Sequence, residues 1–219
     1  MEAIEVDSLT KEFGDFKAVD GISFKVEEGE IFGFLGPNGA GKSTTMMILT
    51  TLLKPTSGRA LVGGYDVMSD AKKVREKIGY VQQEISVDEF LTGRENLYLH
   101  ARINQIPRNL IKSRIDDVLE LVELGEKKDQ ASLTYSGGMR KRLDIANGLL
   151  SRPSVLFLDE PTPNRKIILA PLITHTHSHF FSIKILYICS SLFRNQIIIK
   201  KISFSIESNR SRFTYKGIW

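Results

Sequence analysis

One glycine-rich segment stands out in this chain of 219 residues, and it reads Gly36-Pro37-Asn38-Gly39-Ala40-Gly41-Lys42-Ser43-Thr44. It fits the pattern G-x-x-x-x-G-K-[ST] of a phosphate-binding loop. A mostly apolar run of strand length, residues 30–35, precedes it, and residues 45–53 are long enough for a helix that stops before Pro55. A strand, a glycine turn and a helix N-terminus point successive N–H groups at an anion. We therefore expect Lys42 to reach the β- and γ-phosphates of a nucleotide and Ser43 to offer its hydroxyl to Mg²⁺.

The length of the chain predicts one domain of ordinary size, with room for a subdomain. No stretch of 18 apolar residues occurs, so the sequence predicts no membrane span. The first residues, Met1–Glu5, lack the pattern of a signal peptide. The single cysteine, Cys189, excludes an intrachain disulfide and suits a reducing compartment.

The charge is divided unevenly along the chain. Residues 163–219 hold nine Lys or Arg and one acid, for +8, whereas residues 1–162 hold 21 Lys or Arg and 25 Asp or Glu, for −4. The last quarter also contains three of the four histidines and only one of the 17 glycines. Such a shift in composition marks a different domain or a tail. We therefore interpret residues 1–162 as one domain and residues 163–219 as an atypical basic tail.

Hydrophobic periodicity separates strands from helices. The strand candidates before the helical region are residues 4–9, 18–26, 59–62 and 78–81. The first two alternate with period two, which predicts an antiparallel β layer beside the nucleotide site. From about residue 88 to residue 145 the chain turns helical, with Ile111, Ile115, Val118 and Val122 at helical spacing, and Gly125 as the expected stop. Residues 155–158 are fully apolar, as in a strand buried on both faces.

These elements together predict an α/β fold of the P-loop NTPase class. The expected architecture is a mixed sheet core with an antiparallel β layer and a helical subdomain at about residues 88–145. Because the tail departs in composition, we expect the C-terminal part of the core to be incomplete. The strand at residues 155–158 would then be a poorly covered sheet edge.

Two further motifs carry chemistry. Asp159 and Glu160 directly follow the buried strand, where open α/β sheets gather their ligand groups. We expect Asp159 to hold Mg²⁺, through a water, and Glu160 to polarise the attacking water. The segment Tyr135-Ser136-Gly137-Gly138-Met139 opens another helix. A helix cap explains the serine, but only a close approach to a partner such as phosphate explains the double glycine as well.

Residues 36–44, Gln83, residues 136–138 and residues 155–161 occur in an order and spacing that resembles the ATP-binding subunit of ABC transporters. The neighbouring sequence is similar to that of ATP-binding subunits from the drug-export branch of the family, notably at residues 11–14, 91–97 and 138–143. The resemblance covers residues 2–162. It implies cofactors ATP and Mg²⁺, ATP hydrolysis coupled to transport, and a place on the cytoplasmic face of a cell membrane.

The resemblance also assigns roles to single residues. Phe13 matches the aromatic residue that stacks on adenine, with an ordinary core phenylalanine as the alternative. Gln83 matches the glutamine that touches Mg²⁺ or its water and senses the membrane partner, with a solvent-facing polar residue as the alternative. Ser136 and Gly138 match the signature loop, which binds the ATP held by a second subunit. The implied partners are therefore a second ATP-binding subunit, in a head-to-tail dimer, and a transmembrane permease.

The resemblance ends after Thr162. The family continues with a glycine-leucine-aspartate turn, whereas this chain reads Pro163-Asn164-Arg165-Lys166. His175 follows Glu160 too closely to match the family's switch histidine. His175, His177 and His179 alternate, but with no acidic or cysteine residue nearby we expect no metal site there. A shifted reading frame or a wrong gene boundary explains the change, and predicts a chain that binds nucleotide with little or no turnover.

Two other classes of function stay open at this point. The first is a soluble ABC ATPase acting on nucleic acid or ribosomes, which the acidic residues 1–162 argue against. The second is a non-catalytic interaction protein that binds ATP through residues 36–44 and uses its basic tail as a tether. In that case, deleting residues 163–219 should abolish binding to its partner.

Overall fold

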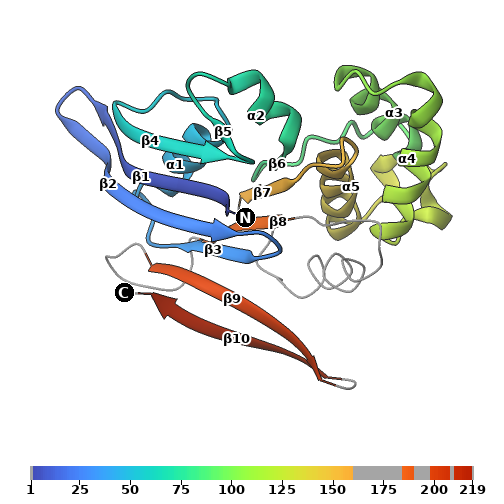
Figure 1. The fold of residues 1–219 in the computed structure, drawn as a ribbon. Coiled ribbons are helices and arrows are strands. Elements are labelled where there is room, and N and C mark those ends of the chain that lie inside the picture. The colour runs from blue at the N-terminus through green and yellow to red at the C-terminus, as the bar shows by residue number, and fades with distance from the viewer. Residues whose placement is uncertain (1, 160–183, 190–197, 208–209, 219) are drawn as a thin grey trace. The chain divides into compact units, whose positions relative to one another are not determined.

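The computed structural model describes residues 2–159, 184–189, 198–207 and 210–218 (Figure 1). The chain divides into two compact units. The β-rich unit comprises Met1–Ile78, Ser154–Glu160 and Lys184–Trp219, and the helical unit comprises Gly79–Pro153 and Pro161–Ile183. The boundary between them falls within strand β6 (Ile78–Val81).

The first sheet of the β-rich unit is antiparallel. It has the strand order β2-β1-β4-β5, and its members are β1 (Glu2–Phe13), β2 (Phe16–Glu27), β4 (Ser57–Val62) and β5 (Tyr65–Asp66). The hairpin β1–β2 closes where Phe13 pairs with Phe16. Ile4, Val6 and Leu9 are buried on one side of β1, so their side chains form part of the core. The predicted antiparallel layer is therefore confirmed.

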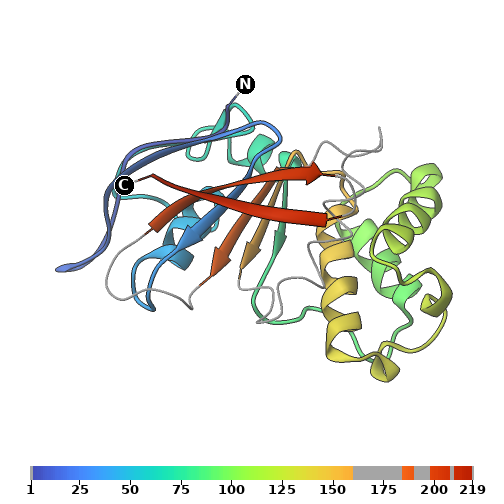
Figure 2. The ribbon, with the colours of Figure 1, turned by 90° about the horizontal axis from the view of Figure 1, so that it is seen from below.

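The second sheet of this unit runs β10-β9-β3-β8-β7. Its strands are β3 (Ile31–Leu35), β7 (Val155–Asp159), β8 (Lys184–Cys189), β9 (Ile198–Glu207) and β10 (Arg210–Ile218). Strand β8 pairs in parallel with β3 on one side and with β7 on the other, while β9 pairs antiparallel with β3. Figure 2 shows the arrows of β3, β8 and β7 side by side.

Strand β7 is not a poorly covered edge, and that expectation is wrong. All five residues of β7 are buried, and β8 pairs with every one of them, from Val155↔Lys184 to Asp159↔Ile188. The sequence could not supply this partner, because β8 lies beyond the point where the resemblance stops. The described part of residues 163–219 therefore contributes strands to the core sheet.

Two helices belong to the β-rich unit, α1 (Lys42–Leu49) and α2 (Ala71–Lys77). The sequence places the first helix at residues 45–53, but it begins and ends earlier. Gly41 is its N-cap, and Thr51 adopts a left-handed φ of 64°, which ends the helix before Leu53. Helix α1 therefore starts within the glycine-rich loop and not behind it.

The helical unit contains α3 (Gly93–Ile103), α4 (Arg108–Leu121) and α5 (Gly137–Leu149), with short 3₁₀ turns at Gly125–Lys127 and Ser132–Thr134 (Figure 1). Ile111, Ile115, Val118 and Val122 are all buried, so the predicted apolar stripe is confirmed. Helix α4 stops before Gly125, because Glu123 turns left-handed with a φ of 56°. None of the helices in the described ranges is long and apolar enough to cross a bilayer.

Candidate functional site

The glycine-rich loop joins the end of β3 to the start of α1. Gly39 and Gly41 have φ of 83° and 80°, in the left-handed region that glycine tolerates. The amide of Ala40 donates to the carbonyl oxygen of Pro37 at 3.2 Å, and the amide of Thr45 donates to Gly41 O at 2.8 Å. The loop is therefore a tight turn that leads straight into a helix N-terminus, which is the geometry of an anion site.

Lys42 lies over this loop. Its Nζ donates a hydrogen bond of 2.7 Å to the carbonyl oxygen of Pro37, and only 5% of the residue is exposed. Ser43, by contrast, is exposed. The ammonium is thus held against the loop backbone by its own chain, while the serine hydroxyl can reach an outside ligand.

Strand β2 packs directly against the loop. A Cβ added at Gly41 would overlap the carbonyl oxygen of Ala18 and lie 3.3 Å from a methyl group of Val19. No side chain fits there even if the backbone strain were tolerated. Glycine is therefore required at position 41 for two reasons, because the backbone has a left-handed φ and because it lies in close contact with the antiparallel sheet.

Asp159 ends β7 at the same edge of the second sheet where the loop begins. Leu35 pairs with Cys189 of β8, and Asp159 pairs with Ile188 of the same strand. The ends of β3 and β7 therefore lie on either side of β8. At the usual spacing between neighbouring strands, the two strand ends are about 10 Å apart. That separation leaves room for a hydrated cation and a phosphate between the carboxylate and the loop.

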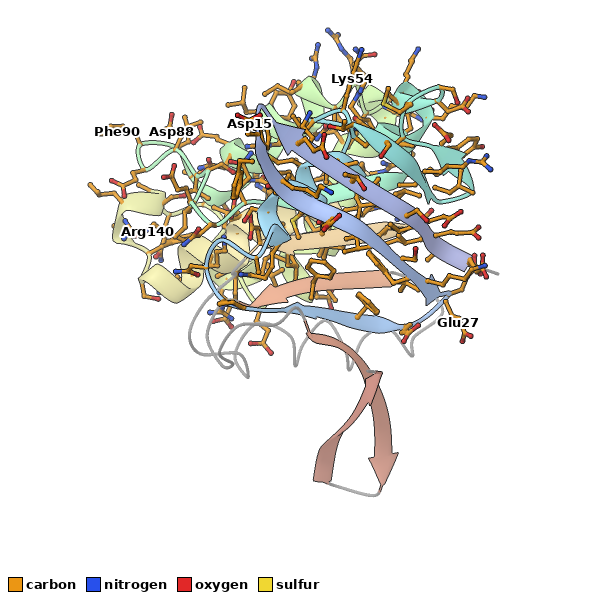
Figure 3. All side chains as sticks on the ribbon, turned by 90° about the vertical axis from the view of Figure 1, so that its left-hand side faces the viewer. Asp15, Glu27, Lys54, Asp88, Phe90 and Arg140 are labelled. Carbon is orange, nitrogen blue, oxygen red and sulfur yellow. The ribbon has the colours of Figure 1, made fainter. Side chains whose placement is uncertain are left out.

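Phe13 is no core phenylalanine. It lies at the end of β1, beside the turn marked by Asp15 in Figure 3, and 50% of it is exposed. The Nζ of Lys11 lies 5.0 Å from the centre of its ring. The alternative of an ordinary core residue is therefore excluded, and the exposed part of the ring is accessible to a planar ligand beside the ammonium of Lys11.

The predicted signature loop caps α5 in the helical unit. Ser136 is the N-cap, its Oγ accepting a hydrogen bond from the amide of Met139 at 3.2 Å, and residues 136–138 are exposed. Among the described residues, a Cβ at Gly137 would meet nothing within 4 Å, and one at Gly138 would meet only Ser136 Oγ at 4.0 Å. Neither glycine has a positive φ. Packing against the residues that the structure describes therefore does not require the two glycines, whereas a close approach by a ligand or partner would explain them.

Tyr135 stands where the family motif has leucine. It is 4% exposed, its hydroxyl donates to the carbonyl oxygen of Lys127 at 2.6 Å, and a Cβ at Gly93 would lie 2.6 Å from that hydroxyl. Burial raises the pKa of the phenol, with the nearby charge of Asp129 acting in the same direction. Tyr135 thus fixes the segment before the two glycines through its hydrogen bond to Lys127, and it leaves Gly137 and Gly138 exposed.

Five further predicted residues are not placed relative to the glycine-rich loop. Gln83 is exposed in the loop after β6, within the helical unit. Its exposure leaves the alternative of a solvent-facing polar residue open. Glu160 and the three histidines at positions 175, 177 and 179 lie outside the residues that the structure describes.

Lys141 and Asp144 were not singled out by the sequence. Both are buried on α5 and both contact the loop that carries Gln83. A Lys and an Asp three residues apart on a helix are normally a solvent-exposed pair, so no signal in the sequence distinguishes them.

The residues of the loop edge fit a magnesium–nucleotide complex. Within the described ranges, no group of three or more His, Cys, Asp or Glu side chains could hold a metal ion. Mg²⁺ is commonly bound by one or two protein oxygens together with waters and substrate phosphates. Ser43 and Asp159 are oxygen ligands of that kind, and the loop amides and Lys42 are groups that could bind phosphate.

Comparison with known proteins agrees with this geometry. Residues 19–163 match the family model of the ABC transporter. The chain is 46% identical over 160 residues to the daunorubicin resistance ATP-binding protein DrrA3 of Streptomyces coeruleorubidus, covering 73% of this chain and 51% of that protein. It is 44% identical over 162 residues to the doxorubicin resistance ATP-binding protein DrrA of Mycobacterium tuberculosis, covering 73% and 49%. The chain thus spans about half the length of the curated relatives it matches.

A solved structure shares the fold. The cbiO1 protein of Clostridium perfringens, part of the ABC transporter complex cbiONQ, superposes with a TM-score of 0.75 at 28% identity, covering 85% of this chain and 78% of that one. The predicted fold class is confirmed. With the phosphate loop, the sheet edge and the open glycine pair in place, the chain belongs to the ABC transporter family, among its ATP-binding proteins.

Proposed function

We propose that this chain binds Mg·ATP through residues 36–44 and serves as the ATP-binding subunit of a drug exporter. The observation that carries the proposal is the loop itself, with two left-handed glycines, a buried lysine and a helix N-terminus. Residues 1–162 form the ATP-binding domain in this proposal, and residues 163–219 are its atypical C-terminal segment. The names of the drug-resistance relatives support the choice of exported substrate class.

The roles at the site follow from charge and position. Lys42 and the amides of residues 36–44 neutralise the β- and γ-phosphates. Bound Mg²⁺ supplies further neutralisation of the triphosphate, and Ser43, Asp159 and Gln83 would be its protein ligands, directly or through water. Glu160 orients the attacking water, and Phe13 stacks on the base. Each role is carried over from the family by position, and exposure of Ser43 and Phe13 supports two of them.

Two proteins are proposed as partners. One is a second ATP-binding subunit, whose nucleotide would be covered by Ser136, Gly137 and Gly138 of this chain in a head-to-tail dimer. The open space beside both glycines supports this contact. The other is a transmembrane permease, which would hold the chain at the cytoplasmic face of the cell membrane.

Turnover is proposed to be low. Residues 163–166 replace the turn that bridges the two subunits in the family, so communication between the two subunits of a formed dimer would be impaired even where nucleotide binds. A steady rate of phosphate release that the Glu160→Gln variant abolishes would show instead that the chain is a competent ATPase.

Gly138→Val tests the proposed dimer contact. A side chain at this position has room among the described residues, so folding and monomer affinity for ATP should be unchanged. Analytical ultracentrifugation of the parent chain with Mg·ATP should show a dimer that the variant does not form. A parent chain that stays monomeric, or a variant that dimerises equally well, would contradict the proposed contact.

A further inference from the structure

Helix α5 carries a buried ion pair. Lys141 Nζ and Asp144 Oδ2 are 3.0 Å apart, and each side chain is 2% exposed. Every other ion pair in the described part of the chain has at least one partner that is one-fifth exposed or more. This pair therefore sits in a different environment from the surface pairs around it.

Both members of the pair bind the loop that carries Gln83. Lys141 Nζ donates to the carbonyl oxygen of Gln82 at 2.5 Å and more weakly to that of Gln83 at 3.5 Å. Asp144 Oδ1 accepts from the hydroxyl of Ser86 at 2.7 Å and from its amide at 3.3 Å. All of these residues belong to the helical unit. The pair thus holds the loop at both ends, near residue 82 and at residue 86.

Stability alone does not explain a pair of this kind. Taking two charges out of water costs so much that an apolar pair of similar volume is often as stable or more stable. Residues 82–86 are exposed and form no helix or strand, so no helical or strand hydrogen bonds fix their backbone, although His100 also bonds to the backbone of Ser86. What the charges provide here is a set of directed hydrogen bonds to one loop.

We infer that Lys141 and Asp144 are positioning residues that fix Gln83 relative to the signature loop. Helix α5 begins directly after Ser136, and Lys141 follows about one turn later, about 6 Å along the axis. A helix of this length is stiff, so a displacement of residues 82–86 is transmitted to residues 136–138. This inference rests on the proposed function for the meaning of Gln83 and the signature loop, but the contacts themselves do not depend on it.

Two double variants of the full chain test the inference. Lys141→Met/Asp144→Leu removes the charges and the hydrogen bonds, whereas Lys141→Gln/Asp144→Asn removes the charges but keeps an amide donor for Gln82 and an oxygen acceptor for Ser86. Native-state hydrogen exchange at the amide of Ser86 is the readout. Exchange should be about tenfold faster or more in the apolar variant, given the strength of hydrogen bonds to charged groups, and near the parent rate in the polar one.

The neighbouring surface pair is the matched control. Arg140 Nη1 lies 2.6 Å from Glu89 Oε1, so it joins the same helix to the same loop from an exposed position, near Asp88 and Phe90 in Figure 3. Arg140→Met should leave exchange at Ser86 within about twofold, because exposed pairs contribute little. Unfolding of each variant by urea is followed in parallel, and the apolar variant should be as stable as the parent chain.

The outcomes separate positioning from simple stability. Faster exchange at Ser86 with undiminished global stability supports the inference, and so does loss of the Mg²⁺-dependent part of ATP affinity in the apolar variant alone. Parent-like exchange in the apolar variant, or equally fast exchange in both double variants, would overturn it. If the parent chain binds no ATP, the proposed function fails, while the exchange experiment still decides whether the pair positions the loop.

Discussion

At the scale of single residues, Gly41 and Lys42 join the two sheets of the β-rich unit to the proposed phosphate site. Gly41 leaves the space that Ala18 of β2 occupies, and Lys42 is held by Pro37 within the same loop. These residues were predictable from the sequence, because few residue types can wrap a backbone around phosphate. Lys141 and Asp144 were not predictable, because their burial depends on a loop that lies more than 50 residues away along the chain.

Gly41→Ala should be destabilising beyond the cost of its backbone conformation. Gly64 has nearly the same φ, 82° against 80°, but open space around it, so Gly64→Ala is the matched control. A left-handed φ costs an alanine about 1–2 kcal/mol, and the overlap with Ala18 adds to this only at Gly41. Urea unfolding should therefore show a clearly larger loss for Gly41→Ala, and equal losses would contradict the packing described for the loop.

His100 should titrate below the ordinary histidine value of 6.5. Its half-buried position lowers the pKa, while a backbone hydrogen bond to Ser86 and the charge of Asp144 oppose the shift. Since the unfolded chain then takes up the proton first, the free energy of unfolding should decrease as pH falls from 6.5 towards the pKa of the folded chain. His100→Gln should weaken this pH dependence, and an NMR midpoint at or above 6.5 would contradict the assignment.

At the scale of helices and strands, hydrophobic spacing in the sequence predicted the elements whose formation depends mainly on residues close together in the chain. Strand β6 and the apolar stripe of α4 matched their predictions, whereas α1 ended four residues before its predicted end. The difference arises at Thr51, whose left-handed conformation is unusual for a β-branched residue. Hydrophobic spacing carries no information about such a turn.

Helix α3 should depend on its N-terminal cap. Thr92 Oγ1 accepts from the amide of Glu95, and the Glu95 carboxylate accepts in return from the amide of Thr92, which completes a capping box. Thr92→Ala should lower the free energy of unfolding by about 1 kcal/mol. Ser113 is exposed on α4 and bonds only to Leu110 O in its own helix, so Ser113→Ala should be neutral or stabilising. Equal losses in the two variants, measured with urea, would show that the cap is unimportant.

At the scale of the whole molecule, the order of strands was the feature that the sequence could not predict. Strand β8 joins β3 to β7, although its residues lie beyond the end of the family resemblance. Pairing between segments that are distant in the chain depends on which strand edges of the sheet are still unpaired. The pattern of apolar and polar residues does not show which edges these are. The glycine-rich loop and the strand end at Asp159, which form the proposed nucleotide site, were recognisable none the less, because both segments precede residue 162.

Truncation tests whether the C-terminal strands complete the core. A chain of residues 1–162 loses β8, β9 and β10, so β3 loses its strand partners on both sides and β7 loses its pairing with β8. Exposed edges of this kind promote aggregation, so this chain should be largely insoluble. A chain of residues 1–209 loses only the outermost strand β10 and should stay soluble. Cooperative unfolding of residues 1–162 with parent stability would show that β8 is not needed.

Binding of a triphosphate by the loop at residues 36–44 is the property on which the proposed activity of the chain depends. Equilibrium titration of the full chain with a fluorescent ATP analogue, with and without Mg²⁺, measures this directly. Lys42→Ala should weaken binding by about tenfold to a hundredfold, since it removes a hydrogen-bonding charge, while the exposed Lys54→Ala should bind as the parent chain does. Absence of Mg²⁺-dependent binding in the parent chain, or identical affinities for the two variants, would contradict the central claim.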